Sequence, residues 1–95
     1  MTIWETENYL DWIDNLKDKA GQAIIAARIR RISKGNFGDC KSVGDSVSEL
    51  RIDYGPGYRV YFTRRGQEII LLLCGGDKSS QSRDIETAKR ITKNL

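Results

Sequence analysis

The chain has 95 residues, the length of one small domain, and its 39% hydrophobic and 31% charged residues are typical of a folded globular protein rather than a disordered one. No apolar run approaches the roughly 20 residues of a membrane-spanning helix, and no secretory leader pattern opens the sequence. We therefore expect one domain, residues 1–95, in the cytoplasm and without a membrane partner.

The distribution of charge and the cysteine content indicate which partners and which metal sites to expect. The net charge of +3 is uneven, because residues 1–27 carry two basic and five acidic side chains while residues 28–95 carry fourteen basic and eight acidic ones. Such a basic field favours an anionic partner, nucleic acid first. Histidine is absent, and Cys40 and Cys74 are not spaced as a CxxC pair, so we expect free thiols and no zinc site.

The first third of the chain predicts a short strand and two helices. Residues Thr2–Glu5 can form an edge strand, after which Thr6 is placed to cap a helix whose apolar residues recur at i, i+3, i+4 and i+7: Tyr9, Trp12, Ile13 and Leu16. A second helix is expected from Gln22 to Lys34, and the short connection makes the pair an antiparallel hairpin. Its basic side chains, Arg28, Arg30, Arg31 and Lys34, form either a solvated face or a ridge that binds an anion or a partner.

From residue 36 the pattern changes to that of loops and strands. Residues 36–46 are rich in Gly, Asp, Asn and Ser and predict a loop, with a short strand around Lys41 left open. Residues 47–53 and 58–63 then alternate with period two, and a three-residue Gly55-Pro56-Gly57 loop would place Ile52 opposite Val60 and Leu50 opposite Phe62. The polar residues of both strands gather on the other face: Glu49, Arg51, Asp53, Arg59, Tyr61 and Thr63.

The last third predicts a central strand and a final helix. Residues 67–74 contain the apolar run IILLLC, which has no polar face and should be covered on both sides. Gly75-Gly76 should end the strand and allow close packing, and Ser79 or Ser80 should cap a helix that turns Ile85, Ala88 and Ile91 inward. The expected fold is α+β, a helical hairpin on a mainly antiparallel sheet followed by a C-terminal helix, in the order β-α-α-β-β-β-α.

Two stretches, RIRRISKGNFGDCKSVGDSVSELRIDYGPGYRVYF and LLLCGGDKSSQSRDIETAK, resemble the RelE/ParE superfamily of toxins from bacterial toxin–antitoxin modules, within it the HigB-like addiction-module killer proteins. The resemblance implies a RelE-like fold and a ribosome-dependent messenger RNA endonuclease (mRNA interferase) that inhibits translation. It also implies a helix-turn-helix antitoxin as partner, the two expected to form a heterotetramer. Two alternatives stay open: a ParE-like toxin that binds DNA gyrase without cutting RNA, and an inactive structural relative.

RNA cleavage by attack of a 2′-hydroxyl group on the adjacent phosphate requires proton transfers and stabilisation of charge on phosphorus. Without histidine, this chain would rely on arginine and lysine cations, with Lys or Tyr as a proton carrier and with no cofactor or metal. Arg59 matches the YR position at which RNase members of the superfamily keep a phosphate-binding arginine, and Lys78 lies in the matching GGDKS segment at a helix start. The expected catalytic residues are Arg59, Lys78 and Tyr61, with Arg51, Lys41 and Arg83 as RNA contacts.

Four of these six residues also have a purely structural interpretation. Arg59 could pair across the strands with Asp53, and Arg51 with Glu49 or Asp53. Tyr61 could be an ordinary sheet tyrosine that neither stacks on a base nor donates a proton, and Lys78 an ordinary loop lysine.

Overall fold

The computed structural model describes all residues from 1 to 95. In chain order the elements are β1 (Thr2–Glu5), α1 (Glu7–Asp14), α2 (Lys19–Ser33), β2 (Cys40–Gly44), β3 (Val47–Ile52), β4 (Tyr58–Arg65), β5 (Ile69–Asp77), a 3₁₀ turn η1 (Lys78–Ser80) and α3 (Gln81–Lys93). None of the helices combines the length and the apolar character that crossing a membrane would require. Both cysteines are free thiols.

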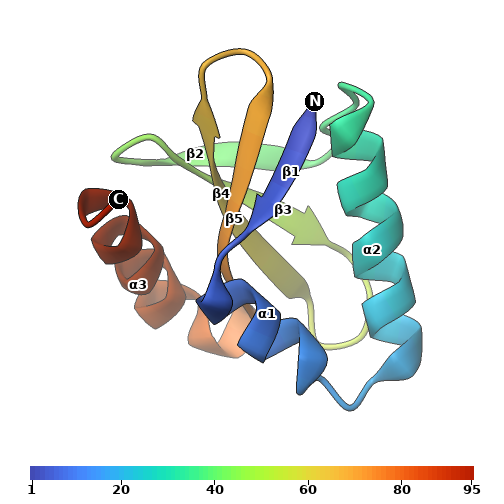
Figure 1. The fold of residues 1–95 in the computed structure, drawn as a ribbon. Coiled ribbons are helices and arrows are strands. Elements are labelled where there is room, and N and C mark those ends of the chain that lie inside the picture. The colour runs from blue at the N-terminus through green and yellow to red at the C-terminus, as the bar shows by residue number, and fades with distance from the viewer.

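The α+β class is confirmed: three helices pack on one five-stranded sheet (Figure 1). The strands lie in the order β1-β5-β4-β3-β2, and only the β1–β5 pair is parallel. The observed sequence of elements has one strand more than predicted, because residues 40–44 form β2 at the edge beside β3. An edge strand that is only partly buried carries little apolar alternation, and this explains its weak signal.

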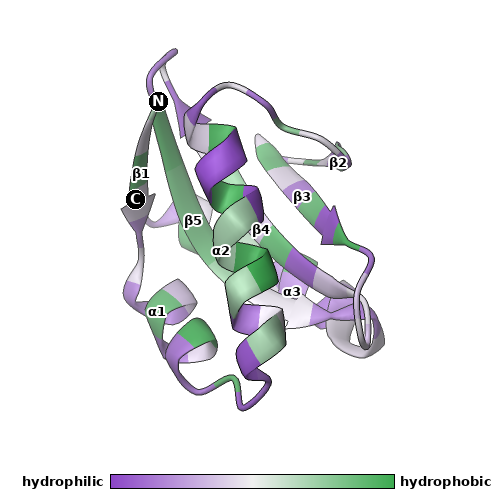
Figure 2. Cartoon of the chain, turned by 90° about the vertical axis from the view of Figure 1, so that its right-hand side faces the viewer, coloured by the Kyte–Doolittle hydropathy of each residue, from purple (hydrophilic) through white to green (hydrophobic).

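One face of the sheet is covered by α1 and α2 and holds the larger hydrophobic core. Figure 2 looks at α2 in front of the sheet, with β5 green along its length behind it. The ten buried residues of this core come from both helices and three strands: Tyr9, Ile25, Ile32, Leu50, Ile52, Tyr58, Val60, Phe62, Ile70 and Leu72. The predicted apolar stripe of the first helix and the predicted apolar face of the hairpin are therefore confirmed.

The opposite face is covered by α3 and holds a smaller core. Its six buried residues are Val47, Tyr61, Leu71, Leu73, Cys74 and Ala88, with Ile85 and Ile91 of α3 packed against them. Central strand β5 contributes to both cores, which confirms that its apolar run is covered on both sides. Figure 1 shows α2 and α3 on opposite sides of the sheet.

The β3–β4 hairpin has the predicted faces and a different register. Ile52 pairs with Tyr58 and Leu50 with Val60, so the connection has five residues and the predicted pairs were wrong by two positions. A shift of two leaves every side chain on its face. In this loop Gly55 and Gly57 both adopt positive φ angles, 56° and 81°, and the hydroxyl of Tyr58, the residue after the loop, donates at 2.7 Å to Asp18, the N-cap of α2.

The end of β5 also differs from the prediction. The strand runs on through Gly75 and Gly76 to Asp77, pairing with the start of β4. The ring of Trp12 lies over Gly75 and the carboxylate of Asp84 over Gly76, so neither position has room for a side chain. These two glycines permit close packing, as expected, but they do not end the strand.

Candidate anion-binding site

Three cross-strand pairs of β3 and β4 point toward the face that α3 covers. In order along the sheet they are Val47 with Thr63, Glu49 with Tyr61, and Arg51 with Arg59. The first two pairs are buried, whereas both arginines remain partly exposed. The two arginines lie beyond the start of α3, where this face of the sheet is open.

A polar pocket of about 440 Å³ lies at these two arginines. It is lined by the residue before β2, the end of β3, the β3–β4 loop, the start of β4 and the first residue after β5. None of its lining residues is hydrophobic: Asp39, Arg51, Asp53, Gly55, Pro56, Gly57, Arg59 and Lys78. Three cations and two carboxylates give the lining a formal charge of +1. Such a pocket suits an anion that brings hydrogen-bond acceptors, for example a phosphate group.

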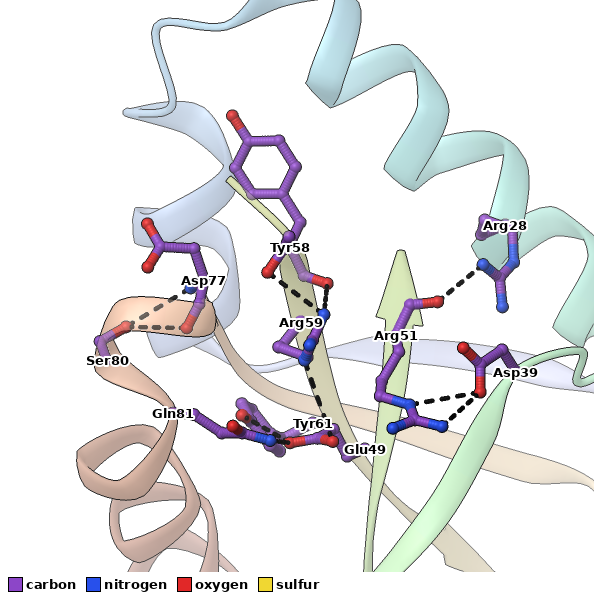
Figure 3. Close-up of polar contacts among 11 residues, drawn as sticks. Arg28, Asp39, Glu49, Arg51, Tyr58, Arg59, Tyr61, Asp77, Ser80 and Gln81 are labelled. Atoms are coloured by element: carbon purple, nitrogen blue, oxygen red, sulfur yellow. Dashed lines mark hydrogen bonds and ion pairs between the residues drawn. The ribbon is translucent and has the colours of Figure 1, made fainter. Parts of the chain in front are cut away.

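Arg59 is the most enclosed cation of the pocket, with 12% of its side chain exposed. Its Nη1 donates to the backbone oxygens of Gly57 and Tyr58, at 3.3 and 3.2 Å, and its Nε lies 3.9 Å from Glu49 Oε1 (Figure 3). Glu49, not Asp53, is therefore its acidic neighbour. The guanidinium is held on two sides, and no protein acceptor binds its remaining nitrogen, Nη2.

Arg51 is held differently from Arg59. Its Nε and Nη2 both donate to one oxygen of Asp39, at 3.2 and 3.0 Å, and 39% of its side chain is exposed. Neither Glu49 nor Asp53 is its partner, so that sequence expectation was wrong. Arg28 of α2 binds the backbone oxygen of Arg51 at 2.9 Å and ties this end of β3 to the helix.

Lys78 is exposed and borders the pocket next to Gly57, whose missing side chain leaves room for it. The backbone N–H groups after Lys78 are not free for a ligand, because the Asp77 carboxylate accepts from the Ser79 amide at 2.8 Å. Hydrogen bonds from the hydroxyl and amide of Ser79 lower the pKa of Asp77. Asp77 is the N-cap of this turn, in a capping box in which the Ser80 hydroxyl accepts from the Asp77 amide at 3.4 Å, and Lys78 contributes its ammonium group alone.

Tyr61 does not line the pocket. It is completely buried, and its hydroxyl donates to Glu49 Oε2 at 3.0 Å. Burial first, and the Glu49 charge second, raise the pKa of Tyr61. A side chain with no exposed surface, whose hydroxyl already donates to Glu49, can neither stack on a base nor reach a substrate, so the expected catalytic role of Tyr61 does not fit its position.

Lys41 and Arg83 are exposed but lie outside the pocket. Lys41 is on edge strand β2 opposite Glu49, and Arg83 is on α3, where its charge helps to lower the pKa of Asp77. Of the six expected site residues, the structure brings together Arg51, Arg59 and Lys78.

Sequence reasoning missed the acidic partners of the site. Asp39 lies in a polar loop without any periodic signal, and only the folded chain places it beside Arg51. Glu49 alternates with buried residues as a solvated side chain would, yet α3 covers it and Gln81 Nε2 donates to its Oε2 at 2.7 Å. With the correct β3–β4 register, the sequence would have placed Glu49 directly opposite Tyr61. That pairing is the one signal that could have indicated a buried carboxylate.

The fold and the site define a small α+β domain with a cationic pocket at one end of its sheet. Residues 11–95 match the family model described as "Phage derived protein Gp49-like (DUF891)", and the chain belongs to this family, which is associated with toxin–antitoxin modules. The chain is also 49% identical, over 93 residues, to an uncharacterised protein of Haemophilus influenzae; the match covers 98% of this chain and 94% of that protein.

Proposed function

We propose that the protein is the toxin of a type II toxin–antitoxin module and inhibits translation by cutting messenger RNA on the ribosome. The observation that carries this proposal is the convergence of Arg51, Arg59 and Lys78 on one polar pocket. The membership of the chain in the Gp49-like family supports it, because that family is associated with toxin–antitoxin modules.

The pocket provides groups for each step of cleavage by 2′-hydroxyl attack. The 2′ oxygen forms a bond to phosphorus while the bond to the 5′ oxygen breaks, giving a 2′,3′-cyclic phosphate and a free 5′-hydroxyl group. Arg59 Nη2 donates to the phosphate oxygens as charge develops there, and one such positioned donor contributes about 3–4 kcal/mol. Asp53, which has no ion-pair partner, accepts the 2′ proton, and Lys78 protonates the leaving 5′ oxygen.

The proposed function includes partners beyond the messenger RNA. A helix-turn-helix antitoxin would hold the toxin inactive, in a heterotetramer, in the cytoplasm. The ribosome would present the message, and the uneven charge of the chain, about +6 over residues 28–95, favours binding to ribosomal RNA surfaces.

The test is cell-free translation with purified protein, followed by mapping of 3′ ends on a translated message and on the same message without a start codon. We expect cuts only in the translated message, and a rate about 10²- to 10³-fold lower for Arg59→Ala. Lys78→Ala should also lower the rate, because it removes an ammonium group from the pocket. Arg65→Ala and Lys17→Ala remove exposed cations outside the pocket and are the matched controls.

The two alternatives give different results. If neither message is cut while cell growth still stops, the RNase function is wrong; inhibition of DNA supercoiling by the wild type and by both pocket variants alike would then identify a gyrase-binding toxin. A protein that is silent in both assays and in growth would be an inactive relative.

A further inference from the structure

We propose that Glu49 is a positioning residue for Arg59: the buried carboxylate fixes the guanidinium so that Nη2 faces the pocket. This inference rests on the proposed function for its catalytic consequence, but the orientation itself is a property of the folded chain. Glu49 does not line the pocket, and its only polar partner among the lining residues is Arg59, so it would not touch the substrate.

Glu49 is a buried carboxylate whose position is fixed by hydrogen bonds to its neighbours. Its side chain has no exposed surface, and its Oε2 accepts from the Tyr61 hydroxyl and from Gln81 Nε2 at 3.0 and 2.7 Å (Figure 3). Its other oxygen, Oε1, accepts no hydrogen bond, and the buried Nε of Arg59, 3.9 Å away, donates none. Two complementary buried groups without other partners therefore face each other across one short gap.

Only an acceptor suits this position. Tyr61, Gln81 and Arg59 all direct donors at Glu49, and an ionised carboxylate is the side chain that offers acceptors alone. Strands β3 and β4 and helix α3 meet at this carboxylate, so its place is fixed from three elements. A buried negative charge in such a place is costly unless a cation compensates it. Lys41 is the cross-strand neighbour of Glu49 on β2, but its side chain is exposed and forms no ion pair with it, whereas Arg59 Nε lies 3.9 Å from Glu49 Oε1.

The opposite edge of the guanidinium completes the orientation. Nη1 is held by the backbone oxygens of Gly57, the last residue of the β3–β4 loop, and Tyr58, the first residue of β4, and Nε points to Glu49, which leaves Nη2 as the free nitrogen. A planar guanidinium that is hydrogen-bonded at one nitrogen and attracted to a fixed carboxylate at a second has little freedom to rotate.

Glu49 also resolves a conflict between like charges. Arg51 and Arg59 are direct cross-strand partners, and two cations in such positions repel each other. Glu49 attracts Arg59 toward α3, while Asp39 attracts Arg51 in another direction (Figure 3). The two carboxylates thereby keep the guanidinium groups apart, and the space between them is available to a phosphate.

The first measurement does not depend on activity. In ¹⁵N NMR of the wild type we expect the Arg59 Nε–H to be protected from solvent exchange, and Glu49→Gln to raise its exchange rate about tenfold or more. Glu86→Gln, the same change at an exposed position of α3, should leave that rate unaltered. Equal exchange rates in wild type and Glu49→Gln would overturn the proposal.

The second measurement is the rate of message cleavage. Misorientation of one catalytic group costs up to about 10²-fold, so we expect a loss of about this size in Glu49→Gln. Glu49→Asp, which keeps the charge but withdraws it by one methylene, should lose less. The core variant Ile70→Val controls for destabilisation, because it changes the buried sheet without touching the pocket.

The outcomes separate the two proposals. Wild-type cleavage with an unchanged rate in both Glu49 variants would overturn the positioning role alone. A wild type that cuts no message, but whose Arg59 Nε–H loses protection in Glu49→Gln, would overturn the RNase function and leave the positioning role standing. If circular dichroism shows that Glu49→Gln is unfolded, Glu49→Asp is used in its place. The proposal is then contradicted if this variant protects the Arg59 Nε–H as well as the wild type does and cuts the message at the full rate.

Discussion

The two faces of the sheet differ in what they bury. The face under α1 and α2 is closed by ten apolar or aromatic residues, whereas the face under α3 combines six such residues with a buried carboxylate, Glu49, and a buried threonine, Thr63. The pocket opens on the second face, directly beyond the buried Glu49–Tyr61 pair. From this difference we infer that the apolar face supplies most of the stability. The polar face has fewer apolar contacts, and its buried polar groups orient charged side chains instead.

The largest expected effect tests whether the α1–α2 face carries most of the stability. Phe62 is 1% exposed and stacks on Phe37. Phe62→Ala should lower the free energy of unfolding by about 3–5 kcal/mol, because it leaves a cavity in a closed core. Urea denaturation measures this change, and a loss below about 1 kcal/mol would show that this core is loosely packed.

A pair of neighbouring glycines compares the two faces at one point of β5. Gly75→Ala must displace the ring of Trp12, which packs on Tyr9 and Tyr58, and should cost about 2–3 kcal/mol. Gly76→Ala meets the ends of the Asp84 and Ser80 side chains, which can turn aside, and should cost about 1–2 kcal/mol. Thermal unfolding of both variants checks the order, and the reverse order would contradict the difference between the faces.

The success of the sequence predictions also differs between the two faces of the sheet. Periodicity predicted the apolar face correctly, because burial between helix and sheet leaves a repeating pattern in Tyr9, Trp12, Leu50 and Val60. It placed Glu49 and Tyr61 among the alternating polar residues of the other face, and nothing local shows that α3 covers them. The same holds for Asp39: a long-range ion pair has no signature in the chain near either partner.

A smaller effect tests the hydrogen bonds of the polar face. Tyr61→Phe keeps the buried ring but removes the hydroxyl that donates to Glu49, while the bond from Gln81 remains. We expect a loss of about 1 kcal/mol in the free energy of unfolding. An unchanged free energy would show that the Tyr61–Glu49 bond adds nothing to the stability of this face.

The pH dependence of stability tests the contact between the start of β4 and the start of α2, which is the hydrogen bond from Tyr58 to Asp18. The Gly21 amide first, and the Tyr58 hydroxyl second, hold the pKa of Asp18 below its ordinary value of 3.8. A lowered pKa in the folded state stabilises the protein above the unfolded pKa, and this contribution is lost as the pH falls through the folded value. Asp18→Asn should therefore lower the free energy of unfolding at neutral pH. Below about pH 4 the free energy of unfolding of this variant should fall less steeply than that of the wild type. Parallel urea titrations of both proteins from pH 2 to 7 measure it, and parallel curves would contradict it.

The smallest expected change in stability concerns the exposed arginine of the pocket. Arg51 and Asp39 are both well exposed, so Asp39→Asn should alter the free energy of unfolding by less than about 1 kcal/mol. The same substitution raises the formal charge of the pocket lining from +1 to +2 and frees the Arg51 guanidinium for a ligand. Binding of inorganic phosphate, followed by NMR titration, should tighten, and more so at low salt, because exposed charges are screened as ionic strength rises. Arg59 is held by Glu49 on the other side, so its Nε–H signal should stay in place; a displaced signal would show that the two arginines are held by one coupled network and not by two separate carboxylates.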